Sequence, residues 1–246
     1  MERTTLIPAE TLVRQSEPFL RWLADWRNGL TRVSLSAFLN EPGFSPAATA
    51  VLAVDVIRGF CEAGPLASAR VGSIVPPIVR LFARAHAEGV THFILPQDTH
   101  RPDAEEFAVW PPHCMAGTVE SETVPQLKEL PFADQFTVLP KNCINSGIGT
   151  GLPRYLDERP QLTTFIVTGD CTDLCVYQLA MYLRLRSHAA GLGYRVVIPA
   201  DCVETYDLPV ERALEIGAMP HDGDLLHHVF LYHMALNGVQ VVAGFD

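Results

Sequence analysis

Short apolar runs alternate with segments of helical periodicity along most of the chain, and this alternation constrains the fold more than any other feature. The apolar runs predict six strands, at residues 49–56, 91–98, 136–141, 162–170, 194–201 and 239–244. The helical segments lie at residues 78–89, 172–191, 208–219 and 224–238. Strands that alternate with helices form right-handed βαβ units with parallel strands. The sequence therefore predicts an α/β fold, a three-layer α/β/α sandwich with a mostly parallel six-stranded sheet.

The segment before the first strand has a different pattern. Residues 9–30 alternate apolar and charged positions at roughly helical spacing, with Pro18 as an interruption, and "NEPGFSPAA" then breaks the chain. We expect residues 1–45 to form an N-terminal helical appendage packed on a core domain at 46–246.

Composition excludes several classes of partner. The 246 residues carry a formal net charge of −10, without a Lys/Arg cluster, which argues against nucleic acid or an anionic membrane. No apolar run approaches the roughly 18 residues of a membrane span. The first residues lack the basic-then-apolar pattern of a secretory signal, so a cytoplasmic location is expected.

Polar side chains follow the apolar runs at the places where the strands are expected to end. They are Asp55, Asp98 with His100, Lys141, the segment 170–175, and Asp201. In parallel α/β sheets, ligands bind beyond the carboxyl ends of the strands. A carboxylate, a lysine, a cysteine and imidazoles at one sheet edge therefore predict a functional site.

The segment "GDCTDLCV" at 169–176 contains two of the six cysteines, four positions apart. Helical geometry does not favour a disulfide between Cys171 and Cys175, and the chain has no C-x2-C pair, so free thiols are expected. Cys175 falls in the first turn of a predicted helix, with Thr172 or Asp173 available as a cap. The helix dipole there favours a thiolate and the amides can hold an oxyanion, although a buried cysteine with no chemical role fits this segment equally well.

Two other residues could support such a nucleophile. Asp55 closes an apolar strand, so it is either a structural carboxylate or a base with a raised pKa. Lys141 is one of only two lysines. Alone, it reads as a solvated strand end, whereas beside a cysteine it would favour the thiolate.

The segment "QDTHRPDAEEFAVWPPHC" carries a set of residues that could bind a metal. Asp98 and His100 alternate at strand spacing, so their side chains can face the same way, and His113 follows two prolines that restrict the backbone. Carboxylate and imidazole donors suit Zn²⁺, Fe²⁺ or Mn²⁺. A polar loop with incidental histidines is the alternative. Four histidines in or beside the last helical pattern read as surface or packing residues: His221, His227, His228 and His233.

Four blocks of the sequence resemble the nicotinamidases of the isochorismatase-like cysteine hydrolase superfamily, closest to the plant-type enzymes. They are "VDVIRGFC", "DTHRPDAEEFAVWPPHCMAGT", "LPKNCINSG" and "VTGDCTDLCV". The resemblance runs from about residue 49 to the end and implies the isochorismatase-like hydrolase fold. It implies a hydrolase that converts nicotinamide to nicotinate and ammonia through a cysteine thioester, in NAD salvage. It also implies a homo-oligomer, with a small-molecule substrate and without nucleic-acid or membrane partners.

The resemblance also implies roles for individual residues. Asp55, Lys141 and Cys175 match the catalytic triad, and a cis peptide is implied between Asp170 and Cys171, with the amides of Cys171 and Cys175 as the oxyanion hole. Phe60 and Trp110 match positions that wall the pyridine pocket. Asp98, His100 and His113 match the ligands of one divalent metal ion, with Zn²⁺ favoured over Fe²⁺ or Mn²⁺ and without a nucleotide cofactor. Glu106, seven positions before His113, matches a further ligand that some members carry.

Two alternatives remain at this point. One is a related cysteine amidohydrolase that acts on another small amide or a carbamoyl group. The other is a non-catalytic binding protein with the same fold, which the presence of all three triad residues disfavours.

Overall fold

The computed structural model describes residues 7–246 and divides the chain into two compact units, Met1–Leu30 and Thr31–Asp246. The described part of the first unit consists mainly of one helix, α1 (Ala9–Asn28), which contains Pro18 and an exposed Glu17–Arg21 ion pair. Residues 31–45 belong to the second unit. The prediction of an appendage at 1–45 that packs on the core stays a prediction.

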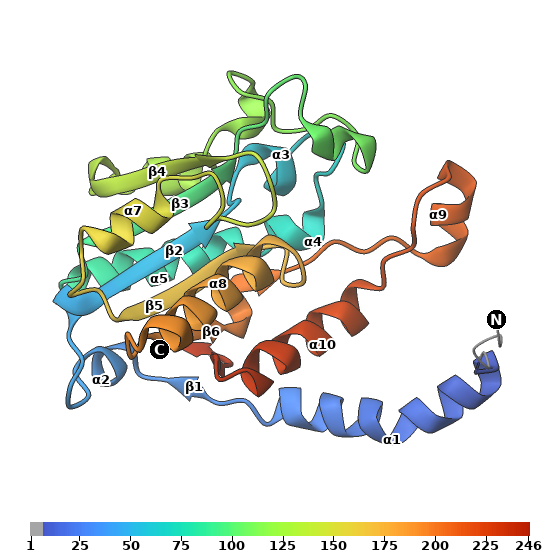
Figure 1. The fold of residues 1–246 in the computed structure, drawn as a ribbon, viewed down its shortest axis with the longest axis horizontal. Coiled ribbons are helices and arrows are strands. Elements are labelled where there is room, and N and C mark those ends of the chain that lie inside the picture. Colours follow the sequence, from blue (N-terminus) through green and yellow to red (C-terminus); the bar gives the residue numbers. More distant parts are fainter. Residues whose placement is uncertain (1–6) are drawn as a thin grey trace. The chain divides into compact units, whose positions relative to one another are not determined.

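The second unit is built on a parallel sheet in which every registered strand pair is parallel (Figure 1). Its strand order is β4-β3-β2-β5-β6-β8, and a short strand β7 also pairs with β5. The bounds are β2 (Thr49–Val54), β3 (His92–Asp98), β4 (Phe136–Lys141), β5 (Thr164–Asp170), β6 (Arg195–Pro199), β7 (Val203–Glu204) and β8 (Gln240–Val242). All six predicted strands are present, each within a few residues of its predicted bounds, and β7 is the addition to the sheet.

Helices cover both faces of this sheet (Figure 1). One face packs against α5 (Val75–Ala87), where Ile78 and Phe82 join Val51 and Phe93 in the hydrophobic core. The other face carries α8 (Cys175–Ala190), which contacts β5, β6 and β2, and α10 (Gly223–Leu236), which contacts α8 and β8. Because successive strand residues point to opposite faces, a buried strand such as β2 fills both layers, which explains its continuous apolar run. The three-layer prediction is confirmed.

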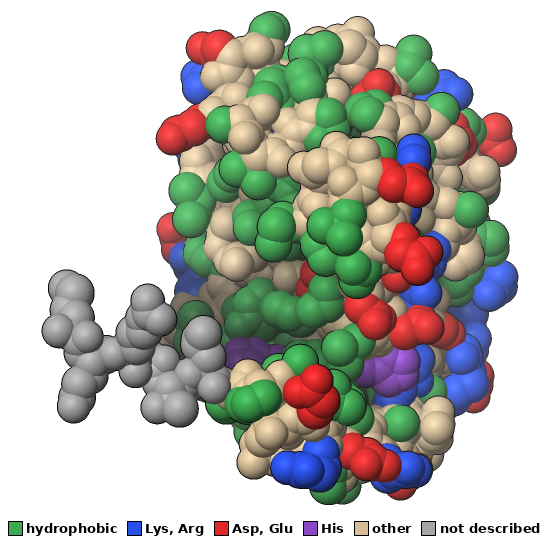
Figure 2. Space-filling model, turned by 90° about the vertical axis from the view of Figure 1, so that its right-hand side faces the viewer, with side chains coloured by type: hydrophobic (Ala, Val, Ile, Leu, Met, Phe, Trp, Pro, Cys, Tyr) green, Lys and Arg blue, Asp and Glu red, His purple; other side chains and the backbone are tan. Residues whose placement is uncertain are grey.

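Short elements that the sequence did not reveal connect these layers. They are β1 (Arg32–Val33), which pairs with β9 (Gly244–Phe245), and the helices α2 (Leu35–Leu39), α3 (Arg58–Cys61), α4 (Ala69–Gly72), α6 (Pro125–Lys128) and α7 (Leu152–Asp157). Between β7 and α10 the chain makes an excursion that carries α9 (Val210–Ile216). This excursion exposes Val210, Leu214, Ile216 and Met219, and Figure 2 shows hydrophobic side chains gathered on the face toward which it projects. No helix among residues 7–246 has the length and apolar character that a membrane span requires.

Candidate active site

The carboxyl ends of four neighbouring strands bring the predicted polar residues together. Asp98 and Lys141 are paired in register as the last residues of β3 and β4, Asp55 directly follows β2, and Asp170 ends β5. Asp55 has a left-handed backbone with φ of 57°, which directs the chain out of the strand, while its amide remains bonded to the carbonyl of Pro96 at 2.9 Å. Asp201 is not part of this group and pairs with Arg32 at 2.8 Å.

A glycine allows the ends of β2 and β5 to approach closely. Gly169 has φ of +112°, and a Cβ at this position would lie 1.9 Å from the carbonyl oxygen of Val54. Only glycine fits this conformation and this spacing. The "TGD" sequence that ends the fourth predicted strand therefore positions Asp170 next to Asp55 at the sheet edge.

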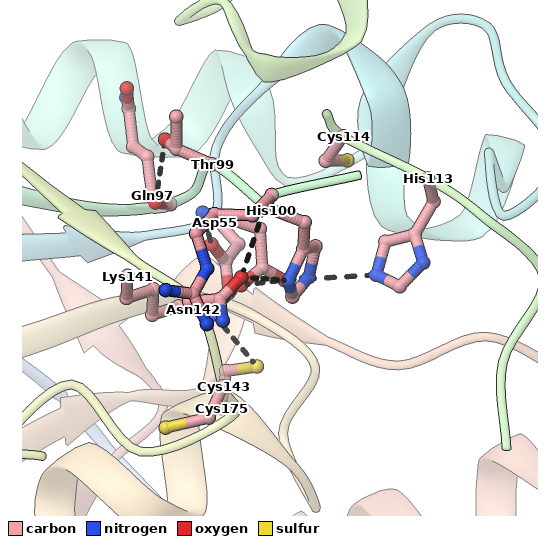
Figure 3. A network of polar contacts seen from close by, with 12 residues as sticks. Asp55, Gln97, Thr99, His100, His113, Cys114, Lys141, Asn142, Cys143 and Cys175 are labelled. Atoms are coloured by element: carbon pink, nitrogen blue, oxygen red, sulfur yellow. Dashed lines mark hydrogen bonds and ion pairs between the residues drawn. The ribbon is translucent and has the colours of Figure 1, made fainter. Parts of the chain in front are cut away.

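Lys141 is the centre of a buried charged cluster (Figure 3). Its Nζ lies 2.7 Å from Asp55 Oδ2, 2.6 Å from Asp98 Oδ1 and 3.5 Å from Cys175 Sγ. The side chains of Lys141 and Asp55 are fully buried, and that of Asp98 is 2% exposed. Burial lowers the pKa of Lys141, but the charges of Asp55 and Asp98 outweigh it and raise the pKa well above its usual value. Lys141 is therefore a cation that holds two carboxylates and a sulfur atom together.

Asp55 has the electrostatics of a base. Burial raises its pKa to about 7, together with the charge of Asp98 and against the opposing effect of Lys141. Its Oδ1 accepts a hydrogen bond from the Asp98 amide at 2.8 Å, which orients the carboxylate. A carboxylate whose pKa lies near neutrality can both take up and return a proton during a reaction.

Cys175 is the first residue of α8, and its side chain is buried beside Lys141. Burial raises the pKa of the Cys175 thiol well above its usual value, although Lys141 lowers it. The sequence suggested that a helix start and a lysine would favour a resting thiolate. In the structure desolvation is the larger effect, so the resting group is a thiol whose proton must move to a base before or during attack.

The turn before Cys175 offers two amide groups toward the same site. The peptide bond between Asp170 and Cys171 is cis. Within residues 7–246, neither the Cys171 nor the Cys175 amide is bonded to a protein acceptor, so both N–H groups are available to an oxyanion. The suggested caps are wrong, because Thr172 Oγ1 bonds to His227 Nδ1 at 2.9 Å and Asp173 bonds to Thr205 and His221.

Asp98, His100 and His113 offer ligand atoms that all lie within 4.8 Å of one another, and all three residues are buried. Figure 3 shows the two imidazole rings turned toward each other, with centroids 4.7 Å apart. His113 Nδ1 donates to the carbonyl of Pro111 at 2.8 Å, which leaves the Nε2 lone pair for a ligand. His100 Nε2 lies 3.4 Å from Asp98 Oδ1 and is buried without a hydrogen bond to any of the described residues. An orphaned imidazole nitrogen next to a carboxylate fits a divalent metal ion.

Glu106 lies apart from this three-residue group. It belongs to the 3-10 turn Glu105–Ala108 and lines the same cavity, but its carboxylate is not among the atoms that lie within 4.8 Å of one another. Its carbonyl accepts the Trp110 amide at 3.0 Å, so its backbone supports the cavity wall. Direct metal ligation by Glu106 stays a prediction.

A cavity of about 650 Å³ opens onto the nucleophile and the histidines. Its lining includes Asp55, Cys175 and His113 together with the predicted pocket residues Phe60 and Trp110. The ring of Phe60 lies 5.6 Å from that of His113, centroid to centroid. The site therefore combines an apolar recess with a polar floor, as small-molecule sites commonly do.

Sequence reasoning missed three features of the site. Asn142 Oδ1 lies 3.2 Å from His100 Nδ1, and the only signal was its position next to Lys141. The Asp170 side chain has a buried oxygen without a hydrogen-bond partner in the part of the chain that the structure describes, whereas only its peptide bond had been considered. His221, taken for a surface or packing residue, precedes α10 and is a buried partner of Asp173; no local pattern reveals this contact across 48 residues.

Comparison with known proteins places this arrangement among enzymes. The isochorismatase domain model matches residues 49–222. Nicotinamidase 1 of Arabidopsis thaliana is 35% identical over 207 residues, which cover 77% of this chain and 83% of that protein. A nicotinamidase structure from Bacillus subtilis has a TM-score of 0.63 at 25% identity, covering 79% of this chain and 99% of that one. A cysteine hydrolase structure from Pseudomonas syringae pv. phaseolicola has a TM-score of 0.68 at 22% identity, covering 87% and 92%.

The fold and these matches define the class of protein: a hydrolase built on a parallel α/β sheet. The match over residues 49–222 begins at the first strand of the central sheet and includes every residue of the candidate site. The chain belongs to the isochorismatase family.

Proposed function

We propose that this protein is a metal-dependent nicotinamidase that hydrolyses nicotinamide to nicotinate and ammonia through a thioester on Cys175. The observation that carries the proposal is the buried cluster in which Lys141 Nζ lies within 3.5 Å of Cys175 Sγ and 2.7 Å of Asp55 Oδ2. The similarity to Nicotinamidase 1 of Arabidopsis thaliana supports the choice of substrate.

In the first half of the reaction, Cys175 Sγ attacks the amide carbon and Asp55 takes the thiol proton. The pKa of about 7 suits Asp55 to this transfer, and Lys141 stabilises the negative charge on sulfur. The carbonyl π electrons move to oxygen, where the amides of Cys171 and Cys175 stabilise the charge. The C–N bond then breaks, and nitrogen leaves as ammonia with the proton from Asp55.

In the second half, Asp55 takes a proton from water as the water oxygen attacks the thioester carbon. The C–S bond breaks, Asp55 returns the proton to the Cys175 sulfur, and nicotinic acid leaves and ionises to nicotinate. Asp55 thus acts twice, and Lys141 keeps it in place throughout. Phe60 and Trp110 enclose the pyridine ring in the cavity and exclude water from its faces.

Asp98, His100 and His113 would hold the metal ion, with Glu106 as a further ligand. When bound, the metal would supply a Lewis acid that holds a ring nitrogen. Mixed imidazole and carboxylate ligands favour Zn²⁺. The proposal also includes a cytoplasmic, homo-oligomeric enzyme of NAD salvage.

Ammonia release from nicotinamide tests the proposal. The wild type should release ammonia, Cys175→Ala should release none, and a chelator should abolish an activity that added Zn²⁺ restores. A metal-loaded wild type that leaves nicotinamide intact would refute the substrate, and activity in Cys175→Ala would refute the nucleophile.

A further inference from the structure

A second buried carboxylate with a histidine partner lies beside the reactive turn, and the mechanism above does not use it. Asp173, two residues before Cys175, accepts hydrogen bonds from Thr205 Oγ1 at 2.6 Å and from His221 Nε2 at 2.8 Å. Asp173 and His221 are each 8% exposed. Asp173 lies in the turn between Cys171 and Cys175, so its buried hydrogen bonds determine the position of this turn.

Both ring nitrogens of His221 have a partner. Its Nδ1 lies 2.9 Å from the backbone carbonyl oxygen of Tyr206, and its Nε2 lies 2.8 Å from Asp173 Oδ2. Burial raises the pKa of Asp173, but the hydrogen bonds from His221 and Thr205 outweigh it, so the net shift is downward and the carboxylate is ionised. The His221 ring therefore links the side chain of Asp173 to the backbone of Tyr206.

The same ring contacts the wall of the substrate cavity. The Tyr206 ring stacks on His221 with centroids 3.8 Å apart and planes inclined by 20°, and Trp110 meets Tyr206 edge-on at 6.1 Å. Tyr206 and Trp110 line the cavity that contains Cys175. Backbone bonds of 2.7 and 2.9 Å between His221 and Leu208 close the base of the α9 excursion. One residue thus connects the reactive turn, the cavity wall and this excursion.

We propose that His221 is a positioning residue: it holds the turn at residues 170–175 in a fixed relation to the Tyr206–Trp110 wall. The substrate amide is then presented to Cys175 with its oxygen at the amides of Cys171 and Cys175. This inference rests on the proposed amide hydrolysis. Because the oxyanion exists only in the transition state and its intermediates, a displaced turn lowers kcat more than it raises KM.

His221→Phe tests this role, because phenylalanine keeps a ring against Tyr206 and removes the two ring nitrogens that contact Asp173 and Tyr206. We expect kcat for nicotinamide to fall about 100-fold, the cost of misplacing a catalytic group by about 1 Å. Exposed His188, in the last turn of α8, provides the matched control, and His188→Phe should behave as the wild type. His221→Gln keeps one donor toward Asp173, so its kcat should be about tenfold higher than that of His221→Phe.

Two probes of Cys175 separate positioning from a general loss of structure. Pyridine-3-carboxaldehyde adds to the Cys175 thiol: a C–S bond forms, the carbonyl π electrons move to oxygen and Asp55 takes the thiol proton. The affinity of the protein for this aldehyde should fall about 100-fold in His221→Phe. Iodoacetamide alkylates sulfur by displacing iodide, without an oxyanion, and its rate at Cys175 should change less than about threefold. If the affinity for the aldehyde and the rate of alkylation fell by the same factor in His221→Phe, the proposal would be overturned.

If the wild type does not hydrolyse nicotinamide, the proposed function fails. If it does, and His221→Phe matches it, only the role of His221 fails.

Discussion

Lys141→Met should destabilise the fold more than any other single change of charge at the site. The substitution keeps the length of the side chain but leaves Asp55 and Asp98, which lie 2.7 and 2.6 Å from Nζ, without a cation. Removing one partner from a buried ion pair costs about 3–5 kcal/mol because the remaining charge stays desolvated. For a chain of this size that corresponds to a drop in Tm of about 10 °C.

The chain contains its own control for this experiment. Lys128, the only other lysine, is exposed and pairs with Glu122 at 3.0 Å, and an exposed pair contributes about 0–1 kcal/mol. Urea and thermal unfolding of Lys141→Met and Lys128→Met should therefore differ by several kcal/mol. The difference in unfolding free energy between the two variants should narrow toward about pH 4, since protonation of the carboxylates removes the unpaired charges. Equal stability of the two variants at neutral pH would refute the central place of Lys141 in the site.

Asp170→Asn should raise Tm. Burial raises the pKa of Asp170 well above its usual value, so the folded state retains a proton that the unfolded chain releases. The stability of the wild type therefore falls as pH rises. The gain in Tm should be larger at about pH 8 than at about pH 4, and a variant less stable than the wild type at both would contradict this. Gly169→Ala should prevent stable folding, because its Cβ would lie 1.9 Å from the Val54 oxygen; a soluble variant with unchanged Tm would be inconsistent with the structure. His113→Ala should reduce the zinc bound after reconstitution, measured by atomic absorption, while His228→Ala, on α10, should not. Full zinc content in His113→Ala would exclude it as a ligand.

The sheet could be predicted because its strands are buried on both faces. Runs such as 49–54 and 164–170 are fully buried, so they are mostly apolar and stand out from helical patterns. Strands of two residues, such as β1 and β9, carry no periodicity that a sequence could reveal. The true start of α8 was also hidden, because Thr172 and Asp173 look like caps but bond to residues beyond position 200.

The residues that form the site could be predicted for a similar reason. Parallel strands end at one edge, so Asp55, Asp98 and Lys141 had to converge once the strands were located. The state of Cys175 could not be predicted, because the balance between desolvation and the charge of Lys141 depends on burial in three dimensions. The contact of His221 with Asp173 could not be predicted because the two residues lie 48 positions apart.

The covalent intermediate tests the central claim most directly. Wild-type protein mixed with nicotinamide and quenched rapidly in acid should carry a nicotinoyl group, and peptide mass spectrometry should locate it on Cys175. Cys175→Ala should carry none and release no ammonia. Ammonia release without any acyl group on Cys175, or continued turnover by Cys175→Ala, would contradict the account.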